Sequence, residues 1–163
     1  MTVKDVNRIP ELRKKIKKMT ASEIQGGVLG NEQLAIIAGA NEFGARIEVT
    51  DAMRKVLAWK GLYLKKKTEY ITIPERPAIR NTFDNKKNIK EVYDIAGGVY
   101  DIDANLNTTL KAMGEKLVSQ IQKSIKSNYS PKNHPFTVKQ KGGKNKTLIN
   151  TGRYVQGIRY KIK

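Results

Sequence analysis

The chain has 163 residues, of which 32 are Lys or Arg and 15 are Asp or Glu, giving a net charge of +17. This length predicts one domain, and the absence of cysteine excludes disulfides and thiolate-bound metal sites. With a single histidine, His134, a His-rich metal site is excluded too, so we expect no cofactor. The longest apolar stretch, Leu34 to Ala40, is far shorter than the roughly 18 residues that a membrane span needs. We expect neither a membrane segment nor a signal peptide, because charges interrupt the N-terminal region.

The first 44 residues predict a helix, a strand and a second helix. Residues 23–29 predict a short strand, and residues 32–43 predict a mostly buried helix that ends at Gly44. Before them, five basic residues lie opposite an apolar stripe, which predicts a helix with a solvated basic face. The stripe consists of Val6, Ile9, Leu12, Ile16 and Met19.

Residues 45–72 predict a segment that projects from the domain. A Thr-Asp cap and a glycine stop indicate a short helix over 51–60, and alternating β-branched residues indicate a strand over 68–73. We expect Lys65, Lys66 and Lys67 to be exposed in the turn between them. The alternative places the aromatic residues of this segment in the core: Trp59 and Tyr63.

The second half is dominated by helices. A helix can begin at Pro77 and continue to Ala96, and a basic loop over 130–146 precedes a half-buried strand over 154–162. Together these elements predict an α+β domain over 1–163, with a small mixed or antiparallel sheet covered on one side by two long helices. The clearest helix has a core stripe of Leu106, Leu110, Met113, Leu117, Ile121 and Ile125.

The charged residues show no spacing typical of a catalytic or metal site, so the sequence does not predict an enzyme. The acidic residues Asp84, Glu91, Asp94, Asp101 and Asp103 match no metal-ligand spacing, and helix caps account for them. By contrast, residues 127–163 hold nine bases and no acid, a block that attracts polyanions or an acidic protein face. The alternative is a solvated surface that keeps the protein soluble. Candidates for DNA or subunit contact are Lys139, Lys141, Lys144 and Lys146.

Three segments in order resemble the tail-completion, or virion-morphogenesis, proteins of long-tailed bacteriophages. They are LAIIAGANEFG at 34–44, ITIPERPAIRNTF at 71–83, and the stretch from SPKNHPFTVKQKG through KTLINTGRYVQGIRYKI. The chain departs from the family pattern at Ala78, where Phe is usual, at Asn150, where Asp is usual, and at Ala45, where Thr often follows. Residues 45–72 also form a longer insert than shorter members carry. The motif residues are Asn41, Glu42, Phe43, Gly44, Ile73, Pro74, Arg76, Pro77, Arg80, Leu148, Ile149, Thr151 and Gly152.

The resemblance implies a structural virion protein that joins or completes the tail at the head–tail interface. It implies a homo-oligomeric ring in the neck that contacts a head connector and the tail tube or its terminator, with assembly in the host cytoplasm. Packaged DNA passing through such a ring would meet a basic surface without sequence readout. The competing hypothesis is a nonspecific nucleic-acid-binding protein, which the charge of +17 favours on its own.

Overall fold

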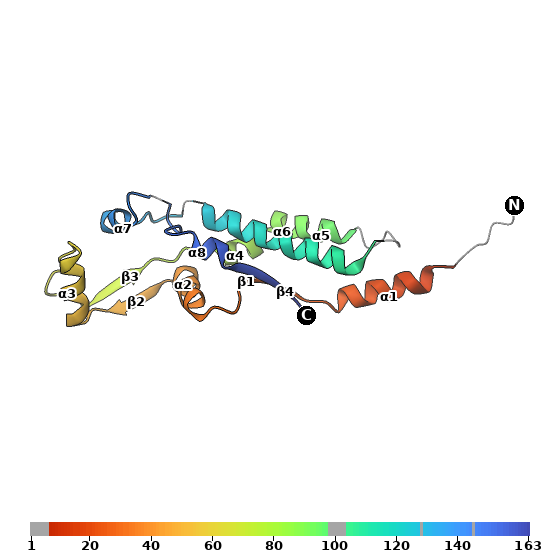
Figure 1. Ribbon diagram of the computed structural model, residues 1–163, viewed down its shortest axis with the longest axis horizontal. Helices are drawn as coiled ribbons and strands as arrows, with labels where there is room; N and C mark the ends of the chain where they lie inside the picture. The colour runs from red at the N-terminus through yellow and green to blue at the C-terminus, as the bar shows by residue number, and fades with distance from the viewer. Residues whose placement is uncertain (1–6, 98–103, 128, 145) are drawn as a thin grey trace.

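The computed structural model describes residues 7–97, 104–127, 129–144 and 146–163, and it is elongated (Figure 1). A helical body built around α6 (Leu106–Lys126) occupies the middle, an arm that ends in α3 (Asp51–Trp59) extends to one side, and α1 (Ile9–Thr20) extends to the other (Figure 1). The predicted α+β class is confirmed. Its strands form two separate two-stranded antiparallel sheets, one from the two ends of the chain and one within the arm.

The body is organised by α6 (Leu106–Lys126), the predicted long helix. Its first turn is capped by the Asn105 side chain, which accepts hydrogen bonds from the backbone N–H groups of Asn107 and Thr108. The predicted stripe is core: Leu106 is partly buried against it, and Leu110, Met113, Leu117, Ile121 and Ile125 are buried.

The terminal sheet packs directly on α6. Strands β1 (Ile24–Val28) and β4 (Ile158–Ile162) pair antiparallel, with Ile24 opposite Ile162. Two glycines allow this close approach. A Cβ on Gly114 would lie 2.3 Å from the Tyr160 ring, and a Cβ on Gly26 would lie 2.7 Å from Leu117 Cδ2. Larger residues at either position would push the sheet away from the helix.

The helix expected from Pro77 to Ala96 is divided into α4 (Ala78–Asp84) and α5 (Lys86–Ala96). The break lies at Asn85, which adopts an extended backbone and caps α5 by accepting from the N–H groups of Lys87 and Asn88. An asparagine between two short apolar runs therefore ends one helix and begins the next.

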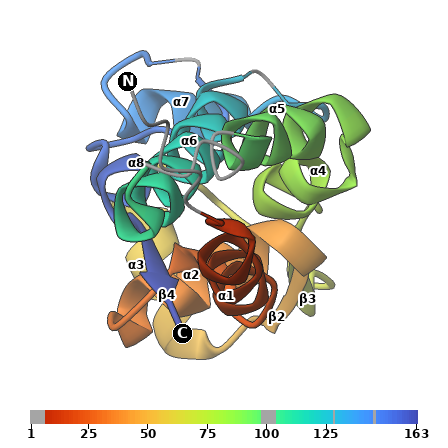
Figure 2. The same cartoon turned by 90° about the vertical axis from the view of Figure 1, so that its right-hand side faces the viewer.

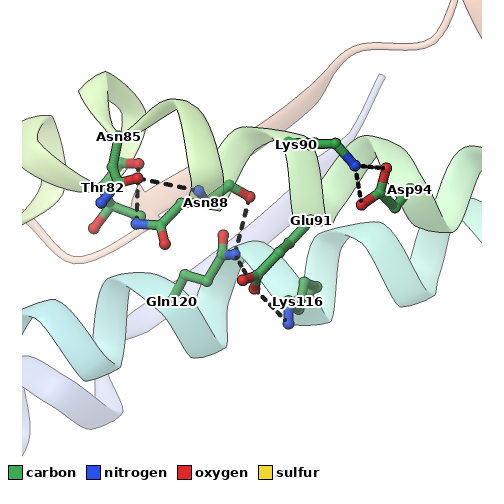
Figure 3. A network of polar contacts seen from close by, with 8 residues as sticks. All are labelled: Thr82, Asn85, Asn88, Lys90, Glu91, Asp94, Lys116 and Gln120. Atoms are coloured by element: carbon green, nitrogen blue, oxygen red, sulfur yellow. Dashed lines mark hydrogen bonds and ion pairs between the residues drawn. The ribbon is translucent and has the colours of Figure 1, made fainter.

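Polar contacts join α5 to α6 (Figure 3). Gln120 Nε2 donates to the Asn88 carbonyl at 2.9 Å, and Lys116 Nζ lies 2.9 Å from Glu91 Oε2. Gln120 Nε2 also donates to Glu91 Oε2 at 3.3 Å, and the hydrogen bonds from Lys116 and next from Gln120 lower the pKa of Glu91 below its ordinary value. The acidic residues of α5 thus act in helix packing and in a surface pair between Lys90 and Asp94.

Helix α2 (Glu32–Phe43) corrects the expectation of a mostly buried helix. Only Leu34, Ala38 and Glu42 are buried, at steps of four that mark one face of the helix. Ile36 is 73% exposed and Phe43 is 74% exposed. The sequence is apolar all round, but the neighbouring elements, α4 and β1, cover one side.

Helix α1 (Ile9–Thr20) extends away from the body (Figure 1), and Figure 2 views the molecule from the end that carries this helix. All of its residues are described and none is buried; Ile9 is 59% exposed, and Met19 packs against the core at the other end. Val6, the first residue of the predicted stripe, lies outside the described residues.

The arm contains β2 (Ala45–Glu48), α3 (Asp51–Trp59) and β3 (Tyr70–Ile73). Strands β2 and β3 pair antiparallel from Ala45 opposite Ile73 to Glu48 opposite Tyr70, and β2 was not predicted. Thr50 caps α3 by accepting from the Met53 N–H at 3.2 Å. The arm projects (Figure 1), and its aromatic residues are not in the core: Trp59 is 85% exposed and Tyr63 is 81% exposed.

Two further corrections concern the C-terminal region. The predicted loop over 130–146 contains α7 (Pro135–Gln140), which begins where His134 Nδ1 accepts from the Phe136 N–H. The strand predicted over 154–162 begins only at Ile158, because Arg153–Gln156 form the single-turn helix α8. Among the described residues, no helix combines the length and apolar character needed to cross a membrane.

Candidate functional site

The first two motif segments meet at the start of α4. Glu42 is only 7% exposed, and its two carboxylate oxygens accept hydrogen bonds from the N–H groups of Ile79 at 2.7 Å and Arg80 at 3.0 Å. These are otherwise unpaired donors in the first turn of α4, so the carboxylate of α2 caps a neighbouring helix. The Arg80 side chain also binds Glu42, since Nη2 donates to the backbone carbonyl of Glu42 at 2.8 Å.

The connection from β3 to α4 crosses close to the end of α2. The Arg76 N–H donates to the Asn41 carbonyl at 2.6 Å. Gly44 has a φ of +70°, and a Cβ there would lie 3.0 Å from the Ile73 carbonyl oxygen, so glycine suits both the turn and the close approach. Pro74 follows β3, and Pro77 stands at the N-cap position of α4.

The Arg80 side chain covers this crossing from outside. Its guanidinium forms an ion pair with Glu75 and lies 5.6 Å from the centre of the Phe43 ring. Both contacts are at the surface, where screening by solvent limits their contribution to stability.

The third motif segment joins the same junction through Arg76. Its side chain is 6% exposed and donates from Nε at 3.1 Å and Nη2 at 2.8 Å to the Pro131 carbonyl. Burial lowers the pKa of Arg76, but a guanidinium stays protonated at neutral pH. A residue of the central segment therefore holds the start of the C-terminal segment.

Hydrogen bonds within the C-terminal segment close its loop. Lys141 Nζ donates to the carbonyls of Lys146 at 2.7 Å and Thr147 at 3.1 Å, and Asn133 Nδ2 donates to the Thr147 carbonyl at 3.2 Å. Burial, and next the charge of Arg76, lower the pKa of Lys141. Lys146 Nζ donates to the Lys126 carbonyl at the end of α6.

The last motif residues lead into α8. Leu148 is buried and Ile149 packs against the core. Thr151 Oγ1 accepts from the Arg153 N–H at 3.5 Å, and Gly152 adopts a φ of +86° at the N-cap of α8. The predicted motif residues are thus brought together as a structural junction between α2, α4 and the C-terminal segment.

The predicted contact lysines divide into two pairs. The ammonium groups of Lys141 and Lys146 donate to backbone carbonyls, although Lys146 is itself exposed; Lys139 and Lys144 are exposed on α7 and the turn after it. A residue that sequence reasoning did not connect to them is Lys60 at the end of α3. Its carbonyl accepts from Gln140 Nε2 at 3.4 Å, which brings the arm against α7.

The described surface also exposes large apolar side chains on helices. Ile36 and Ile37, on the outer side of α2, are 73% and 47% exposed. An open hollow of about 370 Å³ between the end of α1 and helices α4 to α6 is lined mainly by apolar residues, Phe83 and Tyr93 among them.

These features indicate contact surfaces. Among the described residues, no three His, Asp or Glu side chains lie together as a metal site would require. The junction residues serve hydrogen bonds within the chain, and the exposed apolar and basic side chains lie around it. Comparison with other proteins provides no further evidence: no family model, no curated protein and no solved structure matches this chain.

Proposed function

We propose that this chain is a structural virion protein of a tailed bacteriophage, which joins or completes the tail at the head–tail interface by assembling into a ring. The proposal begins from the resemblance of the three sequence segments. The observation that carries it is the exposed apolar face of α2, with Ile36 73% exposed and Phe43 74% exposed next to the motif junction. Contiguous apolar side chains on a surface are typical of a protein contact.

The shape of the subunit supports a ring. In an elongated chain whose apolar surfaces lie on different elements, one face of a subunit can meet a different face of the next. Such heterologous contacts generate a closed ring when the rotation between neighbours closes. In this proposal the ring lies in the neck between the head connector and the tail tube or its terminator. Its subunits are made in the host cytoplasm, and they have structural rather than catalytic roles.

The test uses a phage genome from which this reading frame has been deleted. Supplying the wild-type chain is expected to restore infectious particles that contain the protein. Ile36→Lys places a charge on the α2 face and is expected to abolish restoration, because burying an unpaired ammonium in a subunit contact is costly. Its matched control is Ala52→Lys, which adds the same charge at an exposed position of α3.

Two results would contradict the proposal. If particles form and infect normally without the protein, it has no role in completing them. If Ile36→Lys restores infectivity as fully as Ala52→Lys, the face of α2 is not a subunit contact. Circular dichroism of both variants checks that each chain is folded.

A second candidate function is nonspecific nucleic-acid binding, and the acid-free stretch over 127–163 favours it. Because Lys139 and Lys144 are exposed, their replacement by Gln is expected to lower the salt dependence of duplex DNA binding by up to about two ion equivalents. An unchanged salt dependence would leave these lysines as a solvated surface.

A further inference from the structure

The arm and α7 meet at one end of the molecule (Figure 1), where the carbonyl of Lys60 accepts from the Gln140 side chain. Two regions that are far apart in the sequence therefore lie at the same end of the molecule, and we name their exposed aromatic and lysine residues the tip surface. It consists of Trp59, Lys60, Tyr63, Lys65, Lys66, Lys67, Lys139 and Lys144, all of them exposed.

The tip surface carries two aromatic rings that face solvent. Trp59 is 85% exposed and Tyr63 is 81% exposed, although tryptophan is normally one of the most buried residues. Gly61, with a φ of +89°, reverses the chain between them. All residues of α3 are described and none is buried, so the rings contribute no core packing in the subunit.

The three lysines that follow Tyr63 in the chain are held in a defined loop. The Arg54 guanidinium donates to the carbonyls of Lys65, Lys66 and Thr68, so it fixes the backbone that carries three consecutive lysines. The backbone N–H of Thr68 also donates to the Lys65 carbonyl at 2.9 Å. Arg54 thereby orders the loop, while the ammonium groups of Lys65, Lys66 and Lys67 remain exposed.

The exposed charge at this end of the molecule is mainly positive, although Asp51 of α3 and Glu69 just before β3 are exposed acidic residues. Six of the eight tip-surface residues are lysines, and the stretch over 130–146 that supplies two of them has no acidic residue. Exposed aromatic rings and exposed lysines at the same end of the molecule match the chemistry of a nucleic acid whose bases are unpaired: bases stack on the rings and phosphates contact the ammonium groups. In a continuous duplex the base faces are already stacked on each other.

We propose that the tip surface binds single-stranded nucleic acid, with bases stacked on Trp59 and Tyr63 and phosphates held by the surrounding lysines. This activity goes beyond ring assembly and does not depend on it, because the arm and α7 belong to one subunit. A second copy of the chain is the other occupant that could cover the rings, and the experiment below distinguishes it.

The test uses the fluorescence of Trp59, the only tryptophan in the chain. The full chain is titrated with an oligo(dT) strand of about 16 nucleotides, the upper end of the site size for one binding domain. We expect saturable quenching that weakens as salt is added. A relaxed, closed circular duplex, which has no ends, is expected to bind with little quenching.

Substitution of the second ring separates stacking from charge. Tyr63→Ala keeps every charge and is expected to weaken oligo(dT) binding by about five- to 150-fold, the range measured for the loss of one stacked base. The same variant should bind the closed duplex like wild type. Equal binding of oligo(dT) by Tyr63→Ala and wild type would overturn the proposed stacking, as would equal Trp59 quenching by both nucleic acids.

A matched pair of triple variants locates the charges. Replacing Lys65, Lys66 and Lys67 by Gln is expected to lower the salt dependence of oligo(dT) binding by about two ion equivalents. The control replaces Lys14, Lys17 and Lys18 by Gln. These lysines are also exposed but lie on α1 at the opposite end of the molecule, so the control should leave the salt dependence of oligo(dT) binding unchanged. Equal losses in both variants would show diffuse charge attraction and overturn the site. A Trp59 blue shift that grows with protein concentration alone would assign the surface to a second copy instead.

Discussion

The body and the arm are stabilised in different ways. In the body, eight residues of α6 are buried, five of them large apolar residues, and the helix packs on β1, β4, α4 and α5, with two glycines that allow helix and sheet to touch. In the arm, by contrast, the helix has no buried residue along its fully described length. The arm depends on the β2–β3 ladder and on the Arg54 hydrogen bonds to its loop. Side-chain packing therefore specifies the body, whereas backbone hydrogen bonding specifies the arm.

The largest expected effect tests packing in the body. Leu117→Ala removes a side chain that is 4% exposed and lies against Gly26, so it should lower the free energy of unfolding by about 2–5 kcal/mol. Urea denaturation measures the change. Val56→Ala in the arm is the control, because Val56 is 51% exposed and should change stability by less than about 0.5 kcal/mol. Similar losses for both variants would show that the arm is packed as tightly as the body.

The next effect compares two helical glycines. Gly114→Ala forces a Cβ to within 2.3 Å of the Tyr160 ring and should destabilise the chain by about 1–3 kcal/mol. Gly39→Ala in α2 meets no described atom within 4 Å and should stabilise by about 0.5–1 kcal/mol. Opposite signs in thermal melts are the expected result. If Gly114→Ala leaves the thermal stability unchanged, β4 can move away from α6 without a cost in free energy.

A smaller effect concerns Tyr154, which is 6% exposed. Its hydroxyl has no hydrogen-bond partner within the described ranges. Tyr154→Phe removes this buried polar atom and should stabilise the chain by about 1 kcal/mol in urea denaturation. A loss of stability would show that the hydroxyl has a partner, such as a bound water.

The same residue makes stability depend on alkaline pH. Burial, and next the charge of Glu42, raise the pKa of Tyr154 well above its ordinary value. Above about pH 10 the unfolded chain loses this proton while the folded chain keeps it, so the free energy of unfolding falls as pH rises. Comparison of wild type and Tyr154→Phe between neutral pH and pH 11 should show a smaller fall in the variant. If the free energy of unfolding falls equally with pH in wild type and in Tyr154→Phe, the alkaline pH dependence does not come from Tyr154.

The smallest effect is expected at the end of the arm. Trp59→Ala removes the largest side chain in the protein, yet the free energy of unfolding should change by less than about 0.5 kcal/mol because the ring is 85% exposed. Leu117→Ala removes a smaller side chain, but it should lower the free energy of unfolding far more because Leu117 is buried. A loss above about 1 kcal/mol for Trp59→Ala would show that the ring is covered in solution.

Local patterns predicted much of the fold. The α6 stripe was readable because its steps of three and four residues continue over six positions. The sequence of α2 was misleading since its apolar residues surround the helix, and tertiary packing alone decides which of them are buried. Strand β2 is four residues long and almost wholly exposed, so it has little hydrophobic pattern and depends on β3 for its definition.

The junction and the tip surface were less predictable. The motif resemblance picked out Glu42, Arg76 and Arg80, but a buried carboxylate that caps another helix has no local signature. The hydrogen bond from Gln140 to Lys60 joins residues 80 positions apart, and no spacing rule anticipates it. Exposure of Trp59 followed from the prediction of a projecting segment, whereas the contact of the neighbouring Lys60 with α7 did not.

The pairing of β1 with β4 has a consequence for the order of folding during synthesis. The ribosome synthesises β1 before α2 to α8, and its partner strand β4 follows all of these helices in the chain. All contacts of the β2–β3 ladder lie within one short stretch, so the arm can form while the chain is still growing. The face of α6 that receives the terminal sheet stays uncovered until translation has passed Ile158–Ile162, so between the synthesis of α6 and that of β4 the nascent chain exposes an apolar helix face that favours aggregation.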